Sequence, residues 1–425
     1  MRLLSRMKDP LIHQQIRRAR AKFVAMAASY SLGVFNDNFF KQVAMLLAIG
    51  AGHKEYQGWM LFLFTAPFVF LAAPAGWLAD RFAKRHIVIG AKGLEVLAMV
   101  CGAAGLLTGS WPLIIAMVCT MGLQSCIFGP SLNGSIPELY PASYVTTANG
   151  VLKVFVTVAI MSGFALAGFV LDSPGEVLGV PAGRFIAAII ALCVAGVGFA
   201  ASLGVPHRPP AMRTGREFPW TGPPDTVRTV AECFRDRVLG MTIVADMFVW
   251  FVGSMEILVI NVLGKEQLGY SDSATSGMLV AQLGGLAAGG LLAGKVATGP
   301  RWHSVLAPAA LGLAAGMGLV AAAATLGEPA RYCGILLGLI VAGVSGGLFM
   351  IPCESFVQVR PAADRRGEVI SAANFMVFIG IMASAPLANA LNEHIMPSVS
   401  FAMLGGLSLL AALAVKVAFG REKKA

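Results

Sequence analysis

Charged residues are scarce in this chain of 425 residues. Asp, Glu, Lys and Arg make up 13% of the sequence and hydrophobic residues 57%, whereas a soluble globular protein carries about 25% charged residues. Ten-residue segments of alternating hydrophobicity are also lacking, which excludes a membrane barrel. Long apolar runs are present instead, at 59–79, 87–107 and 334–352, each close to the roughly 20 residues that an α-helix needs to cross a bilayer. The composition therefore predicts an all-α membrane protein.

The sequence also lacks the patterns of most catalytic and metal sites. The seven cysteines are scattered without metal or disulfide spacing, and the six histidines fall in predicted tails, loops or helix ends. No Ser-His-Asp arrangement or phosphate loop is apparent, so we expect no enzyme, no cofactor and no metal. Although the formal net charge is +10, the basic residues do not gather with aromatic residues on one segment, which argues against a nucleic-acid partner.

Twelve transmembrane helices are predicted from the apolar runs. Most of the 32 Lys and Arg residues lie in the tails and in alternate loops, which by the positive-inside rule places both termini in the cytoplasm. The basic amino terminus is not followed by a cleavage site, so we expect the first helix to remain as an anchor. The predicted helices span residues 23–50, 58–79, 87–108, 111–130, 148–172, 183–205, 237–263, 273–298, 301–326, 331–353, 368–392 and 397–419.

The longest predicted inner loop divides these helices six and six. It covers residues 206–236, is rich in proline and arginine, and is interpreted as a cytoplasmic linker between bundles at 23–205 and 237–420. Residues 1–22 form a basic cytoplasmic segment, either a topology signal or a stretch that lies on anionic lipid. Residues 421–425 are expected to be a cytoplasmic tail.

The two halves of the sequence echo each other. Phe128 to Pro130 closes the predicted fourth helix, and Phe349 to Pro352 closes the tenth. Asp37 precedes Asn-Phe in the first helix, as Asp246 precedes Met-Phe in the seventh. These matches predict two parallel six-helix repeats with a substrate site between them near the bilayer midplane, and alternating access by rocking of the halves.

Charged residues inside predicted helices need an explanation, because a charge at a helix centre costs about 2.5–3.5 kcal/mol on insertion scales. Asp37 and Lys41 are four residues apart on one helical face, where Asn36 and Asn38 broaden the polar patch. We interpret this patch as the strongest candidate for a substrate or coupling site. A purely structural ion pair that fixes helix packing is the alternative.

Four further residues extend the candidate site. Asp246 and Glu256 in the predicted seventh helix are expected either to face a central cavity or to serve local packing. Asn149 and Lys153 belong to the fifth helix, where Lys153 either faces the same cavity or snorkels to the inner surface. The remaining intramembrane charges, which are expected to form a structural pair, are Lys92 and Glu95.

A short charged motif lies between predicted helices two and three. Residues 76–85 read GWLADRFAKR, with one acid and three bases. Asp80 can cap a helix start and pair with a base, which would lock the halves together on the inner side; an ordinary basic loop is the alternative. The second half has Lys295 at the corresponding place, so the latch is expected to be one-sided. The candidate gate residues are Gly76, Asp80, Arg81, Lys84, Arg85, Glu138 and Glu354.

The 76–85 motif resembles the signature loop of the major facilitator superfamily, in which this loop is a conformational latch. With the 36–38 patch, the 137–139 segment (PEL) and the 148–150 segment (ANG), it makes the chain similar to the lysophospholipid transporters of that superfamily, including those fused to acyltransferases. The chain departs from this branch at Leu132, where a lysine is common, and at Glu256, where arginine is frequent.

The resemblance implies inward movement of lysophospholipids across the bacterial inner membrane for reacylation, with Asp37 helping to handle the charged headgroup. The expected partners are a lysophospholipid or another small amphipathic substrate, membrane lipid, and an acyltransferase that would be a separate chain. Two alternatives stay open: an ion-coupled transporter of a small solute or drug, and a membrane scaffold that docks an acyltransferase without transporting.

Overall fold

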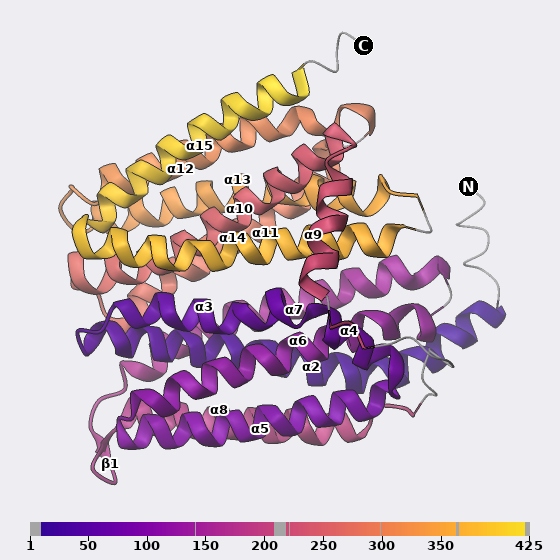
Figure 1. The fold of residues 1–425 in the computed structure, drawn as a ribbon. Coiled ribbons are helices and arrows are strands. Elements are labelled where there is room, and N and C mark those ends of the chain that lie inside the picture. The colour runs from indigo at the N-terminus through magenta and orange to yellow at the C-terminus, as the bar shows by residue number, and fades with distance from the viewer. Residues whose placement is uncertain are drawn as a thin grey trace. The chain divides into compact units, whose positions relative to one another are not determined.

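The computed structural model of the protein (Figure 1) describes residues 10–140, 142–207, 218–220, 222–297, 299–362 and 365–420. The predicted tail at 421–425, the first nine residues of the amino-terminal segment and much of the predicted linker lie outside these ranges. Nearly all of the described chain is helical. The exceptions include two short strands, β1 (Glu176–Val177) and β2 (Val180–Pro181), which pair antiparallel.

The helices follow the order that the apolar runs predict. Those before the predicted linker are α2 (Pro10–Gly50), α3 (Glu55–Phe70), α4 (Ala72–Arg81), α5 (Lys84–Thr108), α6 (Trp111–Leu139), α7 (Ala142–Leu171) and α8 (Ala182–Leu203). Those after it are α9 (Gly222–Cys233), α10 (Arg237–Val262), the π-helix η1 (Leu263–Gln267), α11 (Asp272–Val296), the 3₁₀-helix η2 (Gly299–Val305), α12 (Leu306–Ala323), α13 (Ala330–Val359), α14 (Arg366–His394) and α15 (Pro397–Gly420).

The twelve predicted spans correspond to α2, to α3 with α4, to α5 through α8, and to α10 through α15. Among the described residues, ten helices are long and apolar enough to cross a membrane, or eleven when α3 and α4 count as one bent span. Helix α2 is not among them, since the polar stretch from Asn36 to Gln42 lowers its hydropathy. The fold class predicted from the sequence is confirmed.

The second span is broken, which the sequence pattern did not predict. Helices α3 and α4 meet at a bend of 57° around Leu71. Pro67 lies inside α3, and Pro74 follows in the first turn of α4. Because proline has no N–H, Pro74 cannot bond to the carbonyl of Phe70, and the helix breaks where that bond is missing.

The chain divides into two compact units. The first contains residues 1–43 and 66–222, and the second contains residues 44–65 and 223–425. The end of α2 and the start of α3 therefore belong to the unit that holds the carboxyl-terminal helices. Within that unit the Asn261 amide on α10 donates to the Gln57 side chain over 3.0 Å. The predicted domain boundaries at 205 and 237 stay a prediction.

Close helix packing explains the many glycines. Within the second unit α11 packs against α13, and a Cβ added to Gly285 would lie 2.5 Å from the backbone oxygen of Ile340. Only a residue without a side chain permits that approach. Within the first unit α5 lies alongside α6 and α8, and within the second α12 lies alongside α15 (Figure 1).

Candidate functional site

The predicted polar patch on α2 divides into residues with different partners. Asn36 is fully buried and its amide donates to the backbone oxygen of Ala191 on α8 over 3.1 Å. Asn38 donates to Val34 in its own helix over 2.8 Å. The Asn36 bond thus joins α2 to α8, whereas the Asn38 bond stays within α2. The assignment of both residues to a substrate site stays a prediction.

Asp37 on α2 is an acid of the first unit. Its side chain is buried, and Oδ2 accepts a hydrogen bond of 2.7 Å from the Ser125 hydroxyl on α6. Lys41, one turn further along α2, interacts electrostatically with this carboxylate, as the spacing of four residues predicts. A carboxylate at this depth is stable only when charged or hydrogen-bonding groups surround it.

The predicted pairing of Lys92 with Glu95 is present on α5. The ammonium lies 2.5 Å from Glu95 Oε2, and both side chains are almost completely buried. The Gln124 amide on α6 donates to the same oxygen over 3.3 Å. Since Ser125 also lies 3.0 Å from Gln124 Oε1, a continuous chain of polar contacts joins the ion pair to Asp37.

A small cavity borders this chain of contacts. It has a volume of about 20 Å³, which is the space that one water molecule needs. Asp37 Oδ1 has no hydrogen-bond partner among the described residues of the protein. The cavity is lined by Tyr30, Gly33, Val34, Asp37, Lys92, Gln124, Ser125 and Phe128.

The other predicted substrate residues lie on α7 and α10. Lys153 on α7 is exposed, and the side chain of Asn149 is outside the described part. Asp246 and Glu256 on α10 are buried, and Glu256 accepts a hydrogen bond from Gln282 on α11. Their grouping into one cavity with the residues of α2 stays a prediction.

The predicted gate motif covers the end of α4 and the start of α5. Asp80 lies in the last turn of α4, and α5 begins after Ala83, which forms no side-chain cap. Helix α4 continues through the Leu-Ala-Asp-Arg sequence to Arg81, and the capping role of Asp80 stays a prediction. Arg85 donates to the backbone oxygen of Leu203 on α8 over 3.3 Å. Arg81 is exposed, Gly76 and Lys84 are partly buried, and the Asp80 side chain is outside the described part.

Glu138 and Glu354 lie in helices rather than in loops. Helix α6 continues to Leu139 and α13 to Val359, so the proline before each acid does not end its helix. Membrane helices tolerate proline when neighbouring groups satisfy the freed backbone. Glu354 is partly buried, and the side chain of Glu138 is outside the described part.

Gln124 and Ser125 are the site residues that the sequence analysis did not single out. They are adjacent neutral polar residues in the middle of the predicted fourth helix, which is the signal that could have found them.

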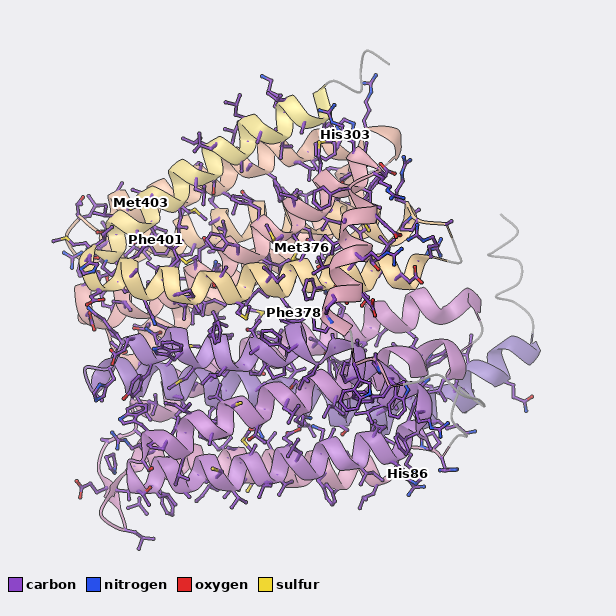
Figure 2. The ribbon with its side chains drawn as sticks, viewed as in Figure 1. His86, His303, Met376, Phe378, Phe401 and Met403 are labelled. Atoms are coloured by element: carbon purple, nitrogen blue, oxygen red, sulfur yellow. The ribbon has the colours of Figure 1, made fainter. Side chains whose placement is uncertain are left out.

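Figure 2 shows His86 and His303 at helix ends, as predicted. Among the described residues no group of His, Cys, Asp and Glu could hold a metal ion.

The family model of the Major Facilitator Superfamily matches residues 22–385. The chain belongs to the major facilitator superfamily. Its relatives in this superfamily include the "Lysophospholipid transporter LplT" of Yersinia enterocolitica, which is 26% identical over 345 residues, covering 79% of this chain and 78% of the relative. The protein of the same name from Salmonella newport is 26% identical over 359 residues, covering 77% of each chain.

Solved transporters share the fold. A bacterial homologue of the human lysosomal transporter Spinster, in an inward-facing and unoccupied conformation, has a TM-score of 0.65 at 15% identity and covers 94% of this chain and 95% of its own. A D-xylose-proton symporter has a TM-score of 0.67 at 16% identity and covers 95% and 97%. The protein is thus a multi-pass membrane transporter by fold and family.

Proposed function

We propose that this superfamily member moves lysophospholipids across the bacterial inner membrane by alternating access. The observation that carries the proposal is Asp37, an acid held in the interior of a membrane bundle with a hydrogen bond from Ser125 and beside a cavity. Burying a carboxylate in a membrane is costly, so its presence points to a polar group that passes through. The curated relatives, which are named lysophospholipid transporters, support the choice of substrate.

The charges on α2 suit a zwitterionic headgroup. A lysophosphatidylethanolamine carries a phosphate and an ammonium a few ångströms apart. Asp37 can accept hydrogen bonds from the ammonium, and Lys41 in the next turn can attract the phosphate. A neutral solute would have less use for two opposite charges on one helix face.

Flux in proteoliposomes tests the proposal directly. Purified protein is reconstituted, and uptake of labelled lysophosphatidylethanolamine is compared with uptake of a sugar and a dipeptide, each with and without a proton or sodium gradient. We expect lysophospholipid flux above that of protein-free liposomes. Gradient-dependent flux of a soluble solute alone would favour a small-solute transporter, and an acyltransferase that co-purifies without any flux would favour a scaffold.

The substitution Asp37→Asn removes the charge and keeps the size. We expect lysophospholipid flux to fall by about tenfold or more, the loss that follows when a charge-assisted contact is removed. The amount of folded protein should be unchanged. Glu176→Gln is the matched control, because Glu176 is an exposed acid in the β1–β2 hairpin. Normal flux in the Asp37→Asn protein would refute the proposed site.

A further inference from the structure

Three helices of the first unit contribute to one unbroken polar chain. Lys92 contacts Glu95 on α5, Glu95 accepts from Gln124 on α6, and Ser125 lies within hydrogen-bond distance of both Gln124 and Asp37. A pair that served only to hold α5 in place would not need this connection to α2. The connection therefore suggests a role for the pair at Asp37.

The ion pair fixes the direction of the Gln124 amide. An ionised carboxylate only accepts hydrogen bonds, so Gln124 must present its NH₂ group to Glu95. Its carbonyl oxygen, Oε1, consequently faces Ser125 at 3.0 Å. The Lys92 ammonium lies 2.5 Å from Glu95 Oε2 and holds that carboxyl group in position. Gln124 cannot turn its amide without losing this arrangement.

Ser125 has one hydroxyl proton and two acceptors within reach. Asp37 Oδ2 lies at 2.7 Å and Gln124 Oε1 at 3.0 Å. When Asp37 is ionised, Ser125 donates to the carboxylate. When Asp37 carries a proton, Asp37 donates to Ser125 Oγ, and Ser125 is free to donate to Gln124. Both arrangements keep Asp37 and Ser125 hydrogen-bonded without any movement of the helices.

We propose that Lys92, Glu95 and Gln124 are positioning residues that allow Asp37 to bind and release one proton during transport. Protonation forms one O–H bond on the Asp37 carboxylate and breaks one O–H bond of a hydronium ion, which becomes neutral water. The adjoining cavity of about 20 Å³ has room for that water molecule. The proposal rests on the proposed function, since it gives Asp37 the coupling role in lysophospholipid transport.

The charges around Asp37 come from two helices. Lys41 and Tyr30 on α2 and Lys92 and Glu95 on α5 all interact with it. In the described part, α6 contributes the neutral Gln124 and Ser125, α7 approaches α2 through Gly163, and α8 presents the backbone oxygen of Ala191. The charges of Asp37, Lys41, Lys92 and Glu95 sum to zero when Asp37 is ionised. A proton on Asp37 gives this cluster one net positive charge, which favours the binding of a phosphate.

Two substitutions should shift the pH midpoint of transport in opposite directions. Gln124→Leu removes the acceptor that Ser125 needs only when Asp37 is protonated, so the midpoint should move to lower pH by about one unit. Ser125→Ala removes a hydrogen bond from both forms of Asp37, and because the charge-assisted bond to the ionised carboxylate is the stronger one, the midpoint should move to higher pH. The double variant Lys92→Met with Glu95→Leu should shift it as Gln124→Leu does, because it frees the Gln124 amide. A purely structural role would change the amount of folded protein and leave the midpoint unmoved.

Infrared spectroscopy tests proton binding without any substrate. The change in the protonated carboxyl C=O band between mildly acidic and mildly alkaline pH is recorded for the wild type and for Asp37→Asn, which identifies the Asp37 signal. We expect that signal to titrate, and to shift in Gln124→Leu and Ser125→Ala as transport does. An Asp37 band that does not titrate overturns the inference. If the band titrates but lysophospholipid does not move, the proposed substrate alone is wrong.

Discussion

At the scale of single residues, Gly33 determines whether Lys92 can reach Glu95. A Cβ added to Gly33 would lie 2.6 Å from the Lys92 ammonium nitrogen and 3.2 Å from Glu95 Oε2. The Gly33→Ala protein should therefore displace Lys92 from its partner and lose about 1–3 kcal/mol of stability.

Gly196→Ala on α8 is the control for this prediction, since a Cβ there meets no atom within 4 Å. The unfolding temperature of each variant in detergent is the measurement. A Gly33→Ala protein as stable as the Gly196→Ala protein would show that the cluster tolerates a side chain at this point.

The sequence allowed Asp37 to be singled out because a charge in an apolar run is costly and therefore visible. It did not reveal Ser125 and Gln124, since neutral polar residues carry no comparable penalty and their role depends on which helices meet. Asn36 is the opposite case. Its position in the chain grouped it with Asp37, yet its amide donates a hydrogen bond to the backbone of α8. Contacts between helices decide such roles, and a single sequence does not contain them.

At the scale of helices, Asp236 anchors the start of α10. Its carboxylate accepts from the backbone N–H groups of Val238 and Leu239 and from Arg360 at 2.8 Å. Burial alone would raise the pKa of Asp236. The hydrogen bond and charge of Arg360 and the two backbone N–H groups lower the pKa by more than burial raises it, so it lies below its ordinary value of 3.8. Asp236→Ala should cost about 0.5–2 kcal/mol, as the loss of a helix cap does.

The pH dependence of this effect has a definite sign. Because the pKa of Asp236 is lower in the folded protein than in the unfolded chain, its stabilisation is complete above 3.8 and is lost as the pH falls through the lower folded value. Denaturant unfolding of the wild type and of Asp236→Ala should therefore differ at neutral pH and converge at strongly acidic pH. A difference that persists in acid would assign the loss to packing.

Helix positions were predictable and helix interruptions were not. Apolar length locates a span, because about 30 Å of hydrocarbon requires it. Proline residues interrupt a helix at one place and not at another. Pro74 coincides with the break between α3 and α4, whereas Pro352 lies inside the continuous helix α13. Which outcome occurs depends on whether neighbouring groups satisfy the freed carbonyl. That information lies in the packing of neighbouring groups. The sequence pattern likewise did not predict helix α9 within the predicted linker.

At the scale of the whole molecule, the sequence repeat and the compact units differ. The repeat divides the chain near its middle, but residues 44–65 belong to the second unit. Gln57 bonds there with Asn261, Lys54 with Glu266 at 3.0 Å, and the Asn389 amide with the backbone of Glu55 at 2.9 Å. Residues 44–65, which precede α4 in the chain, thus join the second unit through side-chain contacts that a hydropathy profile does not reveal.

The orientation of the whole molecule that its basic loops predict is testable at two exposed sites. Leu178, in the hairpin between α7 and α8, is 88% exposed, and Trp220 before α9 is 85% exposed. The positive-inside rule places the hairpin outside and Trp220 in the cytoplasm. In a background without the seven native cysteines, Leu178→Cys should react with a membrane-impermeant maleimide on intact cells, and Trp220→Cys only after permeabilisation. The reverse pattern would contradict the predicted cytoplasmic location of both termini.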